Sequence, residues 1–387
     1  MTSSRRPKGT GSIRNRGAKW QARYSFVDGT GTRRERTKNF GSKSEARVWL
    51  NARLAEAASG LVADSGGVTL GAFLHDWLDS VGVVRLEAAT QSWYRSAVER
   101  HIVPSLGNVR LDRLTPVMIE RFLGEKTDSG RLDGSGGLGT RSVRRLYVTL
   151  HKALNTAVRQ GLITRNPADM ADKPRQSLRD ATLDVWTPDE LASFLLAVSD
   201  ERLSSIWRLA AMTGMRRSEL CGLQWSDVDL EGRSLHVRRA VVVVDGVTIE
   251  KAPKTKASGR SIDLDQTTAD SLREWRRSQL EERMRAGAAW ESGDWVVTDE
   301  IGVPIRPDRL SKTFRRTVEN SGLRRIPFRQ LRHSHATALL RSGAHPKVVQ
   351  ERLGHSSVSV TLDTYSAVLP NMQMQAIEDL ARMFDAG

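Results

Sequence analysis

The most telling stretch of this sequence is Leu353-Gly354-His355-Ser356-Ser357-Val358-Ser359-Val360-Thr361-Leu362-Asp363-Thr364-Tyr365, which ends on the only tyrosine after Tyr147. Two segments centred on arginine lie upstream, Thr213-Gly214-Met215-Arg216-Arg217-Ser218-Glu219-Leu220 and Gln330-Leu331-Arg332-His333-Ser334-His335-Ala336. A phenol, two guanidinium groups and a ring donor are what a metal-free site needs to break a phosphodiester. The phenol attacks phosphorus, and the arginines stabilise the charge that develops there. The order of these segments therefore predicts tyrosine-based phosphodiester chemistry.

The chain is strongly basic. Its 387 residues include 60 Lys and Arg against 45 Asp and Glu, which gives a net charge of +15. The excess is concentrated at the N-terminus, where residues 1–65 carry 14 basic and 5 acidic residues. We expect a polyanionic partner, bound first by an N-terminal module; a basic tail that only solubilises the chain is the alternative.

Cysteine usage and hydropathy indicate the compartment. Cys221 is the only cysteine, so no intrachain disulfide can form, and we expect it to be a small buried packing residue rather than a nucleophile. The N-terminus lacks the apolar stretch of a signal peptide, and the most apolar run, Ala240–Val244, is too short to cross a bilayer. A cytoplasmic protein without membrane contact is expected.

Residues 1–65 are expected to form a small β-sheet and one helix. Alternation over 19–27 predicts a strand whose apolar face is made of Trp20, Ala22, Tyr24 and Phe26. Residues 28–31 read as a hairpin turn before a basic strand at 33–40, and 42–59 has helical spacing. The basic side chains of these strands are expected to form a face that contacts DNA; they are Lys19, Arg23, Arg33, Arg34, Arg36 and Lys38.

The rest of the chain is expected to hold two further domains. Residues 66–168 read as helices, with Thr90 capping one and Thr115-Pro116 starting another. A polar, proline-bearing linker follows at 169–186. Residues 187–387 are mainly helical, with strands expected at 234–244, 247–251 and 259–264. The predicted fold class is a multi-domain α+β protein: a small N-terminal sheet plus helix, an all-helical domain, and a mainly α domain with a small antiparallel sheet.

Two arginine pairs are candidates for binding a phosphate. Arg216 and Glu219 are three residues apart, so on a helix they share a face. There the carboxylate could fix the guanidinium as a phosphate clamp, although a structural ion pair is the alternative. Arg329 and Arg332 have the same spacing and could project into one site or form a solvated basic face.

A histidine and two lysines are the candidate proton donors. His355 follows Gly354, whose backbone freedom permits a sharp turn, although a lone histidine there is more often a helix cap. Lys254 and Lys256 join two strands, where a lysine can reach a groove and protonate a departing oxygen; an ordinary basic loop is the alternative.

No metal or cofactor is expected. The glycine-rich stretch 134–139 lacks the Gly-Lys-Ser/Thr ending of a phosphate loop. His333 and His335 are two apart, rather than the four residues that place a zinc pair on one helical face.

Together these segments resemble the tyrosine recombinase family, in particular phage-type and integrative-element integrases. The stretches at 213–220, 331–337 and 353–365 resemble its three boxes, with the nucleophile ten residues after the histidine, and 253–256 resembles its lysine hairpin. The N-terminal segment resembles the arm-site-binding sheet of such integrases, and the helical domain resembles their core-binding domain.

The resemblance implies a site-specific DNA recombinase that integrates and excises a mobile element through a 3′-phosphotyrosyl intermediate. The implied site consists of Tyr365 as nucleophile, Arg216, Arg332 and Arg329 on the phosphate, His355 as donor, Lys254 or Lys256 as acid, and Glu219 as support. Implied partners are double-stranded DNA with core-type and arm-type sites, a homotetramer on that DNA, and an excision factor or DNA-bending protein. The implied location is the nucleoid of a bacterial host.

The second box departs from the family pattern, because Arg329 stands where histidine is usual. An arginine cannot act as a general base near neutral pH, but it can still donate to a phosphate oxygen. A type IB topoisomerase and a non-catalytic DNA-binding regulator are the alternatives. The separate basic N-terminal domain disfavours the first, and the intact arginines and tyrosine disfavour the second. An apolar stripe at 374–384 predicts a final helix that packs on its own domain or on a neighbouring protomer.

Overall fold

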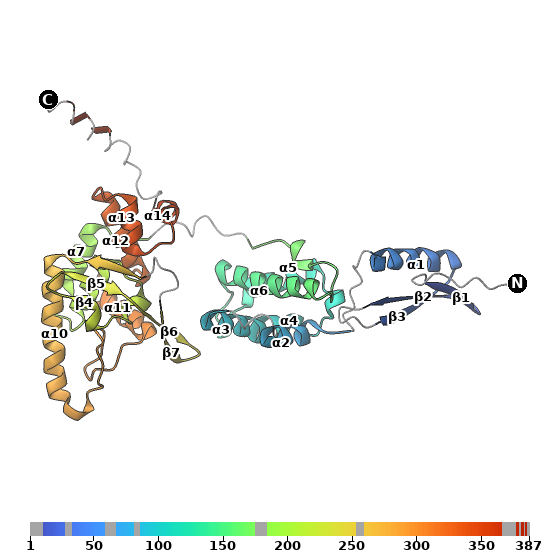
Figure 1. Ribbon diagram of the computed structural model, residues 1–387, viewed down its shortest axis with the longest axis horizontal. Helices are drawn as coiled ribbons and strands as arrows, with labels where there is room; N and C mark the ends of the chain where they lie inside the picture. The colour runs from blue at the N-terminus through green and yellow to red at the C-terminus, as the bar shows by residue number, and fades with distance from the viewer. Residues whose placement is uncertain are drawn as a thin grey trace. The chain divides into compact units, whose positions relative to one another are not determined.

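The computed structural model describes residues 11–27, 33–58, 67–80, 86–174, 184–252 and 259–365, with a few positions between 377 and 384 (Figure 1). The predicted turn at 28–31, Lys254, Lys256 and most of the expected final helix lie outside the described residues. Contacts divide the chain into two compact units, Met1–Asp180 and Ala181–Gly387. The division falls inside the stretch predicted to be a linker.

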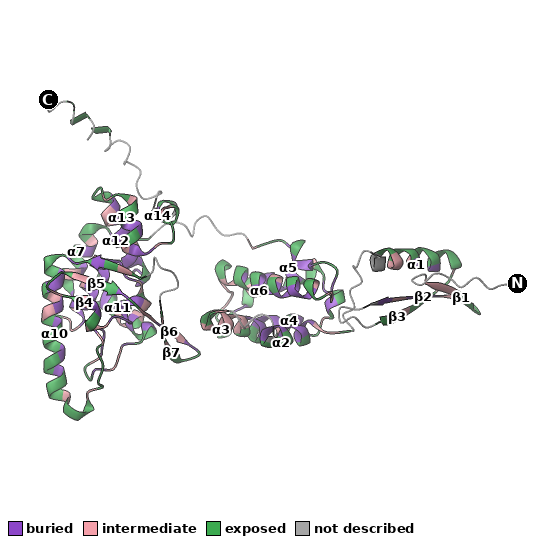
Figure 2. Cartoon of the chain, viewed as in Figure 1, coloured by how far each residue is buried: buried purple, intermediate pink, exposed green. Residues whose placement is uncertain are grey.

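The N-terminal sheet is antiparallel in the order β1-β2-β3, formed by β1 (Ser12–Arg16), β2 (Lys19–Val27) and β3 (Arg33–Phe40). Helix α1 (Lys43–Ala58) covers one face, where Ala22, Tyr24 and Phe26 are buried against Ala46 and Leu50 (Figure 2). The predicted apolar face is therefore confirmed.

The basic residues of this sheet do not share one face, which corrects the prediction. Register pairs Ala22 with Lys38 and Tyr24 with Arg36, so these cations lie on the face that α1 covers. Arg23 alternates to the opposite face, and register places Lys19 and Arg33 there as well. The side chain of Arg34 lies outside the described part of the chain. Successive strand residues point to opposite faces, so a continuous basic run is necessarily divided.

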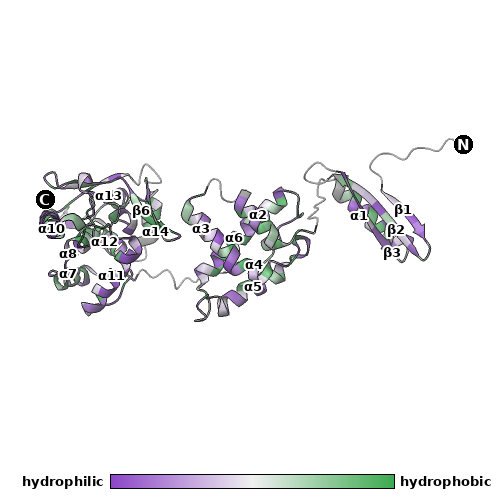
Figure 3. Ribbon diagram, turned by 90° about the horizontal axis from the view of Figure 1, so that it is seen from below, coloured by the Kyte–Doolittle hydropathy of each residue, from purple (hydrophilic) through white to green (hydrophobic). Residues whose placement is uncertain are grey.

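The remainder of the first unit is helical, as predicted. Its elements are α2 (Leu70–Ser80), α3 (Ala88–Ala97), a π-helical turn η1 (Val98–Ile102), α4 (Val103–Leu106), η2 (Leu111–Arg113), α5 (Pro116–Ser129), α6 (Thr140–Arg159) and η3 (Pro167–Asp169). Thr115 caps α5 by accepting from the Met118 amide at 3.3 Å. The predicted cap at Thr90 is wrong, because α3 begins two residues earlier, after Glu87. Figure 3 shows apolar and polar residues alternating around these helices, as expected where one face is buried.

The second unit is mainly helical around a core that includes Trp207, Phe194 and Phe314. Its helices are α7 (Pro188–Ala197), α8 (Ser204–Thr213), α9 (Arg217–Leu220), η5 (Trp225–Asp227), α10 (Gln266–Ala286), η7 (Gly287–Ala289), α11 (Pro307–Asn320), α12 (Arg329–Arg341), α13 (Pro346–Leu353) and α14 (Val358–Tyr365). Cys221 is buried in this core, as expected. In the described residues, no helix has both the length and the apolar character needed to cross a membrane.

Strands of the second unit form two small antiparallel sheets. One has the order β4-β5-β8, from β4 (Val228–Asp229), β5 (Ser234–Val237) and β8 (Arg260–Asp263), and the other pairs β6 (Ala240–Val244) with β7 (Val247–Lys251). The predicted single strand at 234–244 is therefore two strands in two sheets. Arg238 and Arg239 both reach the buried Asp227, at 3.6 and 2.7 Å. Neighbouring side chains of a regular strand point apart, so the strand must break there.

Candidate active site

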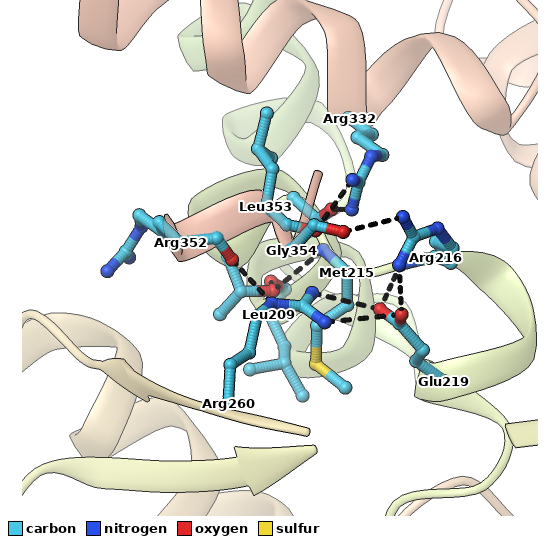
Figure 4. Close-up of polar contacts among 11 residues, drawn as sticks. Leu209, Met215, Arg216, Glu219, Arg260, Arg332, Arg352, Leu353 and Gly354 are labelled. Carbon is cyan, nitrogen blue, oxygen red and sulfur yellow. Dashed lines mark hydrogen bonds and ion pairs between the residues drawn. The ribbon is translucent and has the colours of Figure 1, made fainter. Parts of the chain in front are cut away.

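Three arginines from different elements converge on the C-terminal end of α13 (Figure 4). The contacts are Arg260 Nε to the Arg352 carbonyl at 2.6 Å, Arg332 Nη2 to the Leu353 carbonyl at 2.6 Å, and Arg216 Nη2 to the Gly354 carbonyl at 3.0 Å. The last carbonyls of a helix lack intrahelical partners and carry the negative end of its dipole. The end of α13 is therefore a natural acceptor for guanidinium groups, and three consecutive carbonyls each take one.

The turn after α13 is set by glycine, as predicted. Gly354 adopts a left-handed conformation, with φ 68° and ψ 46°, and the His355 amide donates back to the Gln350 carbonyl at 3.1 Å. Glycine adopts such a conformation without the steric cost that a Cβ imposes. The turn ends the helix and places His355 next to the carbonyls that hold the arginines.

Arg216 and Glu219 are in contact, but the predicted shared helical face is wrong. Arg216 is the residue before α9, with an extended backbone, and its amide and Nη1 donate to the two Glu219 oxygens at 2.8 and 2.6 Å. The Glu219 carboxylate is buried and also accepts two bonds from Arg260, at 3.2 and 2.9 Å. Burial raises the pKa of Glu219, but the hydrogen bonds and charge of Arg260 outweigh it and hold the pKa below its usual value. The carboxylate thus stays charged between two guanidinium groups.

Arg332 and Arg329 lie at the start of α12 and differ in exposure. Arg332 is buried, and its Nη1 donates to the Gly214 carbonyl at 2.8 Å, whereas Arg329 is exposed. Both line a groove of about 970 Å³ that also contains Arg216. The lining residues are Met215, Arg216, Arg217, Ser218, Val242, Ser311, Phe314, Arg315, Arg325, Ile326, Pro327, Phe328, Arg329, Arg332 and His333.

This groove is suited to an anion. Six of its lining residues are arginines, and none of the described residues that line it is acidic. Guanidinium groups bind phosphate through paired hydrogen bonds, and a concave surface of one charge concentrates the field. Each guanidinium has five N–H donors, so the backbone contacts of Arg216 and Arg332 do not use up their donor capacity.

Three histidines near the groove are held neutral at physiological pH. Burial, followed by the charges of Arg332 and Arg216, lowers the pKa of His355 to about 4. Burial and the charge of Arg329 lower the pKa of His333 to about 4. The His355 ring forms a hydrogen bond through Nδ1 with Thr361 Oγ1 at 2.8 Å. When the Thr361 hydroxyl is the donor, Nε2 carries the hydrogen, and a neutral His355 can still donate to an anion.

The structure leaves part of the predicted site undescribed. Tyr365 is the last residue of α14, and its side chain lies outside the described part, as do Lys254 and Lys256. The buried Thr361 belongs to the same helix as Tyr365, so its contact with His355 ties α14 to the end of α13. Across the described segments, no group of three or more His, Cys, Asp or Glu residues is arranged to hold a metal ion.

Two residues of this arrangement were missed from the sequence. Arg260 was part of the basic segment that carries Lys254, but no role was assigned to it. Thr361 was read only as part of the stretch before the tyrosine. Neither stands at a helical or strand spacing from the residues it contacts, so no local signal could have identified it.

This fold and this groove define a tyrosine-type DNA strand transferase. The profile of the Phage integrase family matches residues 185–372, and that of the phage integrase N-terminal SAM-like domain matches residues 69–126. The chain belongs to the phage integrase family of tyrosine recombinases.

Relatives cover most of the chain. Tyrosine recombinase XerC of Corynebacterium efficiens is 32% identical over 289 residues, covering 72% of this chain and 81% of its own length. A XerC-like tyrosine recombinase of Caldanaerobacter subterraneus is 29% identical over 362 residues, covering 89% of this chain and 90% of its own. A solved structure of the Tn1549 transposon integrase with transposon right end DNA has a TM-score of 0.65 at 20% identity, covering 81% of this chain and 100% of that one. The shared fold confirms the predicted α+β class.

Proposed function

We propose that the protein is a site-specific DNA recombinase that cuts and rejoins duplex DNA to integrate and excise a mobile element. One observation carries the proposal: Arg216 and Arg332 are fixed by consecutive carbonyls of one turn beside His355, at a groove rich in arginine. Donors held in place before the reaction stabilise developing charge without reorganisation at the moment of reaction.

The proposed step is a transesterification. The Tyr365 oxygen attacks the scissile phosphorus and forms an O–P bond, while the bond from phosphorus to the 5′ oxygen breaks. The phenolic proton is released to water, and Lys254 gives a proton to the 5′ oxygen, with Lys256 as the alternative donor. The products are a 3′-phosphotyrosyl bond and a free 5′-hydroxyl. Because the covalent bond conserves the phosphodiester energy, rejoining to a partner strand requires no cofactor.

The remaining residues have distinct proposed roles. Arg216, Arg332 and Arg329 donate to the phosphate oxygens, and neutral His355 donates from Nε2. Glu219 does not contact the DNA; its buried carboxylate holds Arg216 through two hydrogen bonds. Arg329 acts through its charge, because a guanidinium does not release its proton near neutral pH.

The proposed partners follow from charge and from the relatives. Residues 1–65 bind arm-type DNA sites, and 66–168 together with 187–387 enclose the core-type site. A homotetramer would bring two core sites together, with an excision factor or a DNA-bending protein as a further partner. The fold matches an integrase whose solved structure contains transposon end DNA. Such a protein would work at the nucleoid of a bacterial cell.

A nicked suicide duplex spanning the ends of the encoding element tests this function. Cleavage of such a duplex releases a short strand, so the covalent intermediate accumulates. We expect a protein–DNA adduct that survives denaturant, and strand exchange on intact duplexes. Relaxation of supercoiled plasmid without strand exchange would instead indicate a topoisomerase, and binding without any adduct would indicate a regulator.

A further inference from the structure

We propose that Arg260, the first residue of β8, is a positioning residue for strand transfer, an inference that rests on the proposed function. Only 6% of its side chain is exposed, and it is not among the residues that line the groove. Arg260 therefore acts on the reaction through other residues and does not contact the phosphate.

Arg260 connects two parts of the site that are far apart in sequence. Its Nη1 and Nη2 donate to the two Glu219 oxygens at 3.2 and 2.9 Å, and its Nε donates to the Arg352 carbonyl at 2.6 Å (Figure 4). Glu219 in turn holds Arg216. One side chain thus fixes the partner of a phosphate-binding arginine and the helix end that orients His355.

Loss of Arg260 should displace Arg216. The Glu219 carboxylate is buried, so without Arg260 it would keep Arg216 as its remaining printed arginine partner. A buried carboxylate that has lost one partner attracts the other more strongly, because few competing donors surround it. Arg216 would then turn toward Glu219 and away from the Gly354 carbonyl. Lysine cannot replace Arg260, since an ammonium group lacks the planar fork that makes two parallel bonds and a third to the side.

A matched control exists in the same unit. Arg202 has the same hydrogen-bond pattern: Nε and Nη2 donate to the two Glu282 oxygens at 2.6 and 2.7 Å, and Nη1 donates to the Thr298 carbonyl at 2.9 Å. Glu282 is buried, like Glu219, but this cluster makes no printed contact with the end of α13. Removal of Arg202 therefore reproduces the cost of orphaning a buried carboxylate without disturbing Arg216.

The test compares Arg260→Gln, Arg260→Lys and Arg202→Gln in the full-length chain. For each variant we would measure the melting temperature, the affinity for a nicked suicide duplex, and the single-turnover rate of adduct formation. We expect both Arg260 variants to bind DNA like the wild type but to cleave about 100-fold more slowly, as for a displaced reacting group. Arg202→Gln should lower the melting temperature comparably and leave the cleavage rate unchanged.

A double variant guards against a simple folding defect. Glu219→Gln with Arg260→Gln removes both charges, so it should recover the melting temperature while the cleavage stays slow. Recovery of the cleavage rate together with stability would overturn the proposal, as would an Arg260→Gln rate equal to that of Arg202→Gln. If the wild type forms no adduct, the proposed function itself fails. Normal wild-type cleavage with unimpaired Arg260 variants refutes only the positioning role.

Discussion

Arg216 donates through Nη2 to the Gly354 carbonyl at 3.0 Å, although 138 positions of sequence separate the two residues. Gly354 immediately precedes His355, so one turn of backbone fixes the arginine and carries the histidine. Any movement of this turn should therefore alter two groups of the site together.

The first prediction concerns the nucleophile. Tyr365→Phe removes a single oxygen from the end of α14, so fold and DNA affinity should be retained while covalent adduct formation is lost. The measurement is denaturing gel electrophoresis of the protein with the nicked duplex. An adduct that persists in the phenylalanine variant would show that another residue attacks.

A second prediction concerns the two buried or half-buried arginines of the groove. Arg216→Ala and Arg332→Ala should each raise the barrier to cleavage by about 3 kcal/mol, as expected for a lost donor to the developing charge. Arg332→Ala should also lower the melting temperature, because it leaves the Gly214 and Leu353 carbonyls without this donor. Arg283→Ala, on the exposed side of α10, serves as a charge-matched control. Equal effects from all three variants would mean that overall charge, rather than placement, matters.

Arg329 provides a third prediction. If it acts through charge, Arg329→Lys should keep partial cleavage activity and Arg329→Ala should lose most of it. Single-turnover rates on the nicked duplex measure both. Wild-type rates in both variants would point instead to His333, which lines the same groove one turn further along α12.

The fourth prediction is a dependence of stability on pH. Burial, followed by the charge of Arg352, lowers the pKa of His335 from 6.5 to about 3. The neutral ring accepts from Arg352 Nε at 3.2 Å, and a protonated ring could not. Between these pKa values the unfolded state binds more protons than the folded state, so the free energy of unfolding falls as the pH falls. Stability should be fully present above about pH 6.5, and His335 alone should account for a loss of about 2 kcal/mol by pH 5.

Denaturant unfolding at pH 7 and pH 5 checks this prediction. His335→Gln keeps a donor and an acceptor but does not titrate, so its loss between the two pH values should be smaller by that amount. An identical loss in the wild type and the variant would assign the acid sensitivity to other groups.

The fifth prediction concerns the N-terminal segment. Deletion of residues 1–65 should spare binding to a short core site and abolish integration on long substrates. Removal of Lys19 and Arg33 from the open face should reduce the salt dependence of arm-site binding by roughly 0.9 in log–log slope per contact. Arg36 and Lys38 lie on the helix-covered face, over Phe26 and Phe40, and removing them is the matched control. A larger effect from the control pair would reverse the assignment of the binding face.

Local pattern was enough to predict most of the elements. The alternation of Ala22, Tyr24 and Phe26 predicted a strand, and the capping box from Thr187 to Glu190 predicted the start of α7; both were found. Glycine at 354 predicted the turn before His355, which the left-handed backbone confirms. These features depend on contacts between residues a few positions apart, which the order of residue types encodes directly.

Long-range relationships depended on packing. The sequence by itself determined the α+β class, the order of the arginine, histidine and tyrosine segments, and the positions of most helices. Only the tertiary structure decided that Arg216, Arg260 and Arg332 meet on three successive carbonyls, that the strand at 234–244 breaks, and that the N-terminal cations divide between two faces. The reason is physical: periodicity reports which side chains share a face of one element. Which elements meet depends on how the core of the unit packs and on which buried groups then find hydrogen-bond partners.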